Sequence, residues 1–260
     1  MNEFSRRGVA ARLREIVPTL GRHGFSLANR TLALARAELA ILATICAVAG
    51  GVWAFVAIAD EVGEGETEAF DRALLVALRN PADLSDPLGP LWFEEAVRDI
   101  TALGGNIVLI FVTFAVIGFL LLMRNRGAAL LVFASVSGEM LIGYLLKGFF
   151  DRPRPDLVPH GAAVYTASFP SNHAMLSAVT YLTLGALLAR LEVHRRVKAY
   201  FLVLSAMLTL AVGLSRVYLG VHWPSDVLAG WCIGAAWAMT VWALALWLQR
   251  RGQVEGPATD

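Results

Sequence analysis

Charge and cysteine are both scarce in this chain of 260 residues. Charged residues make up 17% of it, whereas soluble domains usually carry about 25%. The net charge is only +1, so we expect no nucleic acid as a partner. The two cysteines, Cys46 and Cys232, lie in apolar runs without CxxC or Cys/His spacing, which argues against a zinc site or a disulfide. Because 57% of the residues are hydrophobic, the composition indicates a membrane protein.

Six stretches are apolar over the roughly 20 residues that a membrane-spanning helix needs. They lie near residues 38–59, 106–123, 128–149, 173–190, 198–215 and 225–249. The sequence therefore predicts an all-α fold, a bundle of six transmembrane helices. The long connection 60–105 contains two segments with apolar residues at helical spacing, EAFDRALLVALRN and WFEEAVRDITAL, which predicts a helical loop between the first and second spans. We expect a basic N-terminal segment 1–36, a six-span domain 37–250 and a tail 251–260.

Lysine and arginine are distributed unevenly along the chain. Fifteen of the 22 lie in the N-terminal segment, in the turns at 124–127 and 190–198, and in the tail. The 60–105 connection carries three arginines against eleven acidic residues. Because lysine and arginine favour cytoplasmic loops, we predict a multi-pass cell-membrane protein with cytoplasmic termini and an outward-facing 60–105 loop.

Four basic residues break this rule, because they fall at the predicted outer ends of spans: Lys147, Arg152, Arg154 and Arg216. A cationic cluster at a membrane surface is suited to holding an anion. Arginine forks match phosphate oxygens, and lysine adds a point charge.

Two histidines and a carboxylate lie in stretches that end at the same predicted surface. The run Pro170-Ser171-Asn172-His173 opens the fourth span, where unpaired backbone N–H groups favour an anion. Asp226 follows His222 by four residues, close enough to orient one ring nitrogen. Two imidazoles, a carboxylate and a cationic clamp indicate phosphoryl transfer with a covalent step.

The three patterns K-x6-RP, PSxH and SR-x5-H-x3-D occur in this order from Lys147 to Asp226. Together they resemble the type 2 phosphatidic acid phosphatase (PAP2) superfamily, in its integral membrane lipid phosphatase branch. The resemblance implies that His222 is a nucleophile forming a phosphohistidine, that Asp226 holds its ring, and that His173 is the general acid. It implies phosphate binding by Lys147, Arg154, Ser171, Asn172 and Arg216, and it implies no metal and no cofactor.

Asn172 departs from the family, which usually has glycine at this position. Asparagine is the next most tolerant residue for left-handed backbone geometry. We therefore expect the backbone N–H donor to be kept, and the side chain to add a contact or narrow the pocket.

The resemblance implies a membrane lipid phosphatase of a bacterial inner membrane, acting at the outer face on a phosphomonoester or pyrophosphate. Candidate substrates are undecaprenyl pyrophosphate, phosphatidylglycerophosphate, phosphatidic acid and a lipid A phosphate. A lipid phosphotransferase using the same phosphohistidine is an alternative, and an anion transporter is another, although no inverted repeat is visible. Headgroup, chain and oligomeric state stay open.

We expect structural roles for two charged residues outside the motifs. Arg152, which the motif does not specify, is expected to be an interfacial anchor that reaches toward lipid headgroups. Glu139 lies inside a predicted span, where an acid needs a partner. We expect it to make a structural hydrogen bond within the bundle rather than serve in a proton relay.

Overall fold

The structure is a computed structural model that describes residues 38–162 and 166–250. The predicted segments 1–36 and 251–260 lie outside the described residues. The chain divides after Cys46 into two compact units. The described part of the first unit is the beginning of a helix that runs from Glu38 to Glu64.

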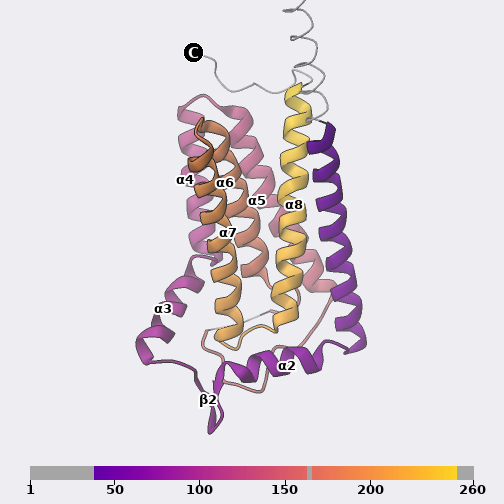
Figure 1. Cartoon of the computed structure of the whole chain (residues 1–260), viewed down its shortest axis with the longest axis vertical. Coiled ribbons are helices and arrows are strands. Elements are labelled where there is room, and N and C mark those ends of the chain that lie inside the picture. The colour runs from indigo at the N-terminus through magenta and orange to yellow at the C-terminus, as the bar shows by residue number, and fades with distance from the viewer. Residues whose placement is uncertain (1–37, 163–165, 251–260) are drawn as a thin grey trace, which may run out of the picture. The chain divides into compact units, whose positions relative to one another are not determined.

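The second unit is built almost entirely of helices (Figure 1). After the helix Glu38–Glu64 come α2 (Glu68–Ala77), β1 (Arg79–Asn80), β2 (Asp83–Pro87), α3 (Leu91–Ala102), α4 (Asn106–Leu122), α5 (Arg126–Phe149), α6 (Asn172–Leu191), α7 (Arg195–Tyr218) and α8 (Pro224–Arg250). Within the described residues, the helix Glu38–Glu64 and helices α5 to α8 are each long and apolar enough to cross a membrane. Helix α4 has 17 apolar residues and passes the same test together with α3, which it meets at a bend of 47°. The predicted all-α, six-span bundle is confirmed.

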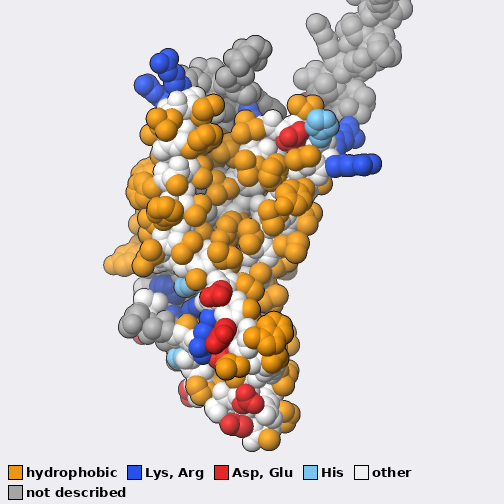
Figure 2. Space-filling model, turned by 90° about the vertical axis from the view of Figure 1, so that its left-hand side faces the viewer, with side chains coloured by type: hydrophobic (Ala, Val, Ile, Leu, Met, Phe, Trp, Pro, Cys, Tyr) orange, Lys and Arg blue, Asp and Glu red, His pale blue; other side chains and the backbone are white. Residues whose placement is uncertain are grey.

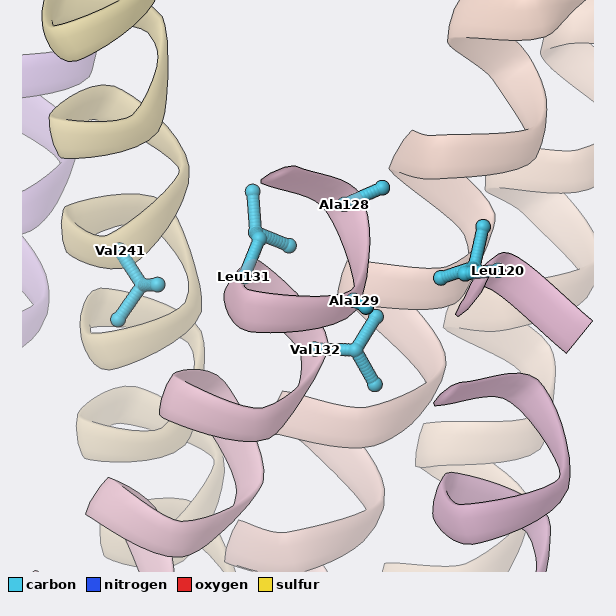
Figure 3. Close-up of a cluster of buried hydrophobic side chains, with 6 residues drawn as sticks. All are labelled: Leu120, Ala128, Ala129, Leu131, Val132 and Val241. Atoms are coloured by element: carbon cyan, nitrogen blue, oxygen red, sulfur yellow. The ribbon is translucent and has the colours of Figure 1, made fainter. Parts of the chain in front are cut away.

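Helix α6 lies at the centre of the bundle and packs against α4, α5, α7 and α8. At the end of the bundle near the α4–α5 turn, small and branched side chains from α4, α5 and α8 form a buried cluster (Figure 3). The turn itself is fixed by Asn125, whose side chain accepts from the Ala128 N–H at 3.1 Å and caps α5. The three sequence motifs lie at the opposite end, where α5 and α7 end and α6 and α8 begin.

The predicted helical loop is confirmed as α2 and α3, which lie at that opposite end of the bundle (Figure 1). The short antiparallel hairpin of β1 and β2 between them was not predicted. Its turn is held by Asn80, which accepts from the Ala82 N–H at 3.1 Å and donates to Asp86 at 2.9 Å. Its sequence, RNPADLSDP, has no alternation of apolar and polar residues, so the usual signal of a strand is missing. Figure 2 shows hydrophobic side chains over the middle of the molecule and charged side chains at both ends, with most of the visible acidic ones at the α2–α3 end.

Candidate active site

A cavity of about 360 Å³ brings the three sequence motifs together. Its lining residues are Asn106, Met140, Tyr144, Lys147, Arg154, Thr166, Asn172, His173, Arg216 and His222. Six of the eight predicted site residues are therefore on its wall. The other two are buried behind that wall: Asp226 beside His222, and Ser171 at the N-cap of α6.

His222 lies in the tight turn between α7 and α8. That turn contains Gly220 with a φ of +70°, and a Cβ at this position would lie 2.9 Å from the Arg79 guanidinium and 3.2 Å from the Pro159 carbonyl. Only glycine fits there without strain and displacement. The glycine therefore lets the chain reverse sharply enough to bring His222 into the cavity wall.

The contacts of His222 define which ring nitrogen is free to react. Arg154 Nη1 lies 3.2 Å from Nε2 of the ring. A guanidinium can only donate, so Nε2 is the acceptor and Nδ1 carries the proton. The Nδ1 atom lies 3.4 Å from Oδ2 of Asp226, the orientation that presents the Nε2 lone pair to the cavity.

His222 is almost wholly buried, and this changes its acidity. Burial, aided by the charges of Arg154 and Arg216, lowers the pKa of His222 to about 4, against the raising effect of Asp226. The imidazole is consequently neutral at physiological pH, which is the form that can act as a nucleophile.

The Asp226 carboxylate is held by more donors than the sequence suggested. Oδ2 accepts from Ser168 Oγ at 2.5 Å and from the Trp223 N–H at 2.9 Å, and Oδ1 accepts from Arg152 Nη1 at 2.5 Å. The expectation that Arg152 is an interfacial anchor is wrong. Its guanidinium is turned inward because two buried carboxylates, Asp226 and Asp71, attract it more strongly than headgroups could.

The cations of the cavity are fixed by hydrogen bonds to oxygen atoms around its rim. Lys147 Nζ donates to the Ala167 carbonyl at 2.7 Å. Arg154 donates through Nε to the Thr166 carbonyl at 2.8 Å and through Nη1 to the Val221 carbonyl at 2.6 Å. The bond of Lys147 uses one of its three donors. Arg154 makes further contacts, through Nη1 to His222 Nε2 at 3.2 Å and through Nη2 to Thr166 Oγ1 and the Ala167 carbonyl at 3.4 Å each. Within residues 38–162 and 166–250 no acidic side chain lines the cavity, so its charge is positive.

Arg216 is buried at the end of α7. Nη1 donates to Thr101 Oγ1 at 3.0 Å, while Nε has no hydrogen-bond partner within the described part of the chain. A buried, under-satisfied guanidinium on the wall of a cavity is suited to an anionic ligand.

Helix α6 begins at the cavity wall with Asn172 and His173. The side chain of Asn172 adds a contact, since Nδ2 donates to Asn106 Oδ1 at 3.0 Å. The Ser171 hydroxyl is buried, is not part of the cavity lining, and has no partner in the described residues. The Ser171 N–H donates to the Asp226 carbonyl at 3.0 Å, so in this arrangement Ser171 joins the start of α6 to α8 and does not face the cavity.

Within the part of the chain that the structure describes, Glu139 lacks the structural hydrogen bond that we expected for it. It is fully buried, and neither carboxylate oxygen has a hydrogen-bond partner within the described residues. It lies beneath the cavity, since a Cβ placed on Gly143 would be 3.6 Å from Glu139 Oε1 and 3.0 Å from Asn172 Oδ1. The structural hydrogen bond expected for this acid is absent from that part of the chain.

Four polar residues of the site were missed from the sequence: Asp71, Asn106, Thr166 and Ser168. Thr166 and Ser168 stand just before the PSNH run, but nothing in their spacing marks them. Asp71 and Asn106 are separated from the motifs by long stretches of chain, so only the fold brings them close.

The chain is similar to known membrane phosphatases. It is 28% identical to phosphatidylglycerophosphatase B of Bacillus subtilis over 186 residues, which cover 69% of this chain and 85% of that protein. It is 34% identical to decaprenylphosphoryl-5-phosphoribose phosphatase of Mycobacterium tuberculosis over 46% of this chain and 63% of that protein. The crystal structure of a transmembrane PAP2 type phosphatidylglycerolphosphate phosphatase from Bacillus subtilis aligns with a TM-score of 0.68 and 25% identity, covering 79% of this chain and 98% of that one.

The matched region contains the cavity. Residues 127–250 match the PAP2 superfamily, and this range includes all three motifs together with helices α5 to α8. Both the motif order and the helical arrangement agree with this match, and the chain belongs to the PAP2 superfamily.

Proposed function

We propose that this membrane phosphatase hydrolyses a phosphomonoester or pyrophosphate of a lipid through a phosphohistidine intermediate. One observation carries the proposal: two imidazoles and three cationic side chains line a single cavity, and one ring presents an unprotonated nitrogen to it. This combination is suited to binding a phosphate and exchanging its ester oxygen for nitrogen.

The first step forms a bond between His222 Nε2 and phosphorus and breaks the bond from phosphorus to the lipid oxygen. His173 donates a proton to that leaving oxygen. Asp226 accepts the Nδ1 proton of His222 in a hydrogen bond and stabilises the positive charge that develops on the ring. Lys147, Arg154 and Arg216 bind the oxygens of the transferring group.

The second step returns the enzyme to its starting state. His173, now neutral, takes a proton from water as the water oxygen attacks phosphorus. The nitrogen–phosphorus bond breaks, inorganic phosphate leaves, and both histidines regain their initial protonation. In a phosphotransferase the hydroxyl of a second lipid would take the place of water.

An apolar groove next to the cavity supports a lipid as the substrate. This groove, of about 280 Å³, is lined by Ile110, Thr113, Phe114, Ile117, Phe133, Val136, Ser137 and Met140. It lies between α4 and α5, and Met140 lines both the groove and the phosphate cavity. A hydrocarbon chain can therefore occupy the groove while its phosphate reaches His222. The names of the relatives from Bacillus subtilis and Mycobacterium tuberculosis both describe phosphatases of lipid-linked phosphates.

The proposed reaction takes place at the outer face of a bacterial inner membrane. The support is the charge distribution, since the α2–α3 end carries the acidic 60–105 connection while most lysines and arginines lie elsewhere. A membrane-impermeant thiol reagent applied to intact cells tests this with Ser85→Cys in β2, in a chain whose native cysteines are replaced. Labelling only after lysis would place the site on the inner face instead.

The function is tested by a phosphate-release panel on purified protein in detergent with EDTA. The panel contains undecaprenyl pyrophosphate, phosphatidylglycerophosphate, phosphatidic acid, a lipid A phosphate and decaprenylphosphoryl phosphoribose. We expect release from at least one of them, and none from His222→Asn. A new labelled lipid without free phosphate would favour the transferase, and flux in liposomes without hydrolysis would favour the transporter.

A further inference from the structure

Behind His222, on the side away from the cavity, the charged groups of Arg152 and Asp71 connect helix α2 to Asp226. Arg152 Nη1 donates to Asp226 Oδ1 at 2.5 Å, and Nη2 donates to Asp71 Oδ2 at 2.8 Å. Both carboxylates are completely shielded from solvent, and the Arg152 side chain exposes 14% of its surface. Burying charges costs several kcal/mol per ion even when they are paired, so this arrangement is not explained by stability alone.

Ser225 makes a second connection between Asp71 and Arg152. Its N–H donates to Asp71 Oδ1 at 2.8 Å, and its hydroxyl donates to Asp71 Oδ2 at 2.6 Å. Arg152 Nη1 also lies 2.8 Å from the Ser225 hydroxyl. Since Ser225 and Asp226 are both in the first turn of α8, the contacts fix α2 against the start of α8.

The consequence concerns the two oxygens of Asp226. Arg152 occupies Oδ1, which leaves Oδ2 to face Nδ1 of His222. Arg152 holds one oxygen of the Asp226 carboxylate, and Asp71 in turn holds Arg152. The Asp226 carboxylate therefore cannot rotate to exchange its oxygens. The Arg152 guanidinium also places a positive charge beside the Asp226 carboxylate. This charge reduces the effect of the Asp226 negative charge on the His222 ring.

We propose that Arg152 and Asp71 are positioning residues of the reaction, which fix the orientation of Asp226 and thereby hold the His222 ring neutral with Nε2 facing the phosphate. The inference rests on the proposed function, because it assigns a role relative to the nucleophile. Neither residue lines the catalytic cavity. Their loss should therefore lower kcat and leave KM nearly unchanged.

A change in how His222 titrates distinguishes positioning from a merely structural role. The charged and titratable groups that face the ring are Lys147 on α5, Arg154 in the loop after it, His173 on α6, Arg216 on α7 and Asp226 on α8. Arg152→Gln removes a positive charge from Asp226 and leaves all of these in place. The imidazolium is then better stabilised, and the midpoint of the His222 titration should rise by about one pH unit.

Asp71→Asn should have the opposite effect. It removes the carboxylate that offsets Arg152, so the uncompensated guanidinium attracts Asp226 more strongly and disfavours the imidazolium. The His222 midpoint should then fall. Opposite shifts from two adjacent substitutions are not expected from a general loosening of the site, which would move both variants the same way.

The experiment is an NMR titration of histidine-labelled protein in detergent, with His222 assigned by the signal that His222→Asn lacks. Wild type, Arg152→Gln, Asp71→Asn and the control Arg98→Gln are compared. The control breaks the exposed Arg98–Glu94 pair on α3 and should not move the midpoint. A rise in Arg152→Gln with a fall in Asp71→Asn supports the proposal, whereas an unchanged midpoint in folded Arg152→Gln overturns it.

Thermal unfolding in the same micelles shows which variants are folded. If Arg152→Gln is not, Arg152→Lys replaces it, because lysine keeps the charge but cannot bridge two carboxylates as a fork does. We expect this variant to lower kcat roughly 10- to 100-fold at unchanged KM, as a small misplacement of a reacting group does. An unchanged kcat would overturn the proposal. If wild type releases no phosphate from any lipid, the proposed function fails, and the titration still decides whether Arg152 and Asp71 control the ring.

Discussion

The first residues of two helices meet at the wall of the cavity: Asn172, at the start of α6, donates through Nδ2 to Oδ1 of Asn106, at the start of α4, over 3.0 Å. Both side chains line the phosphate cavity. Asn172 thus bonds to another helix and also occupies space in the cavity that contains His222.

Asn172→Gly is predicted to widen substrate choice. Removing the side chain enlarges the cavity, so KM should fall for the bulkiest headgroup in the lipid panel while kcat for the best substrate changes little. Asn106→Leu is the matched control, because it breaks the same hydrogen bond but keeps a side chain of similar size in the cavity and leaves Asn172 in place. Equal effects of the two variants on KM would show that the hydrogen bond matters and the occupied space does not.

Substitutions of the two histidines are predicted to have different effects on the first reaction step. His222→Asn and His173→Asn should each lower phosphate release at least about 1,000-fold, because each removes a group that acts in the transition state. An aryl phosphate lipid analogue, whose leaving group needs no proton, should restore the first step in His173→Asn and not in His222→Asn. His194→Asn, in an exposed turn, is the control. Rescue of both variants, or of neither, would contradict the assigned roles.

The pH dependence of kcat/KM follows from the buried imidazole. The pKa of His222 is lowered to about 4, chiefly by burial. The proposed nucleophile is the neutral ring, so activity should persist through pH 5 and be lost as the pH falls through about 4. An exposed histidine would lose its activity near its ordinary pKa of about 6.5. A profile of kcat/KM reports the free enzyme and can be measured with a soluble analogue. Loss of activity centred near the ordinary value would refute the assignment.

Gly220 and Gly65 form a matched pair of left-handed glycines, with φ of +70° and +81°. Alanine at Gly65 meets open space, so its cost should be the left-handed strain alone, about 1–2 kcal/mol. Alanine at Gly220 must also displace Val158 and Arg79 and would shift the turn that carries His222. We expect Gly220→Ala to lower both the melting temperature and kcat, and Gly65→Ala to lower only the former. An active Gly220→Ala enzyme would show that the turn tolerates displacement.

The helices of this protein could be predicted from the sequence because long apolar runs are a strong signal. The grouping of the motif residues around one cavity could be predicted from the three motifs and their resemblance to the PAP2 superfamily, since local spacing alone connects only near neighbours such as His222 and Asp226. The hairpin of β1 and β2 could not, since the five residues of β2, DLSDP, contain one leucine among polar residues and proline and show no alternation. Arg152 was misjudged for a different reason. Its partner Asp71 lies 81 positions earlier in the chain, and no local pattern connects an arginine to so distant a carboxylate.

Glu139 illustrates a further limit of sequence reasoning. An acid within a span indicates that something needs it, and the expected answer was a hydrogen bond from a neighbouring helix. The described structure instead leaves its carboxyl unpaired beneath the cavity. The sequence could indicate that the residue is unusual, but which helix faces it depends on how α5 and α6 are rotated against each other.

The bond from the Ser225 N–H to Asp71 joins residues 154 positions apart. During synthesis, α2 emerges long before α8. The Asp71 carboxylate can therefore pair with Arg152 early, but it meets Ser225 only after the last span has been made. The cluster around Asp226 is thus completed by the final helix of the chain.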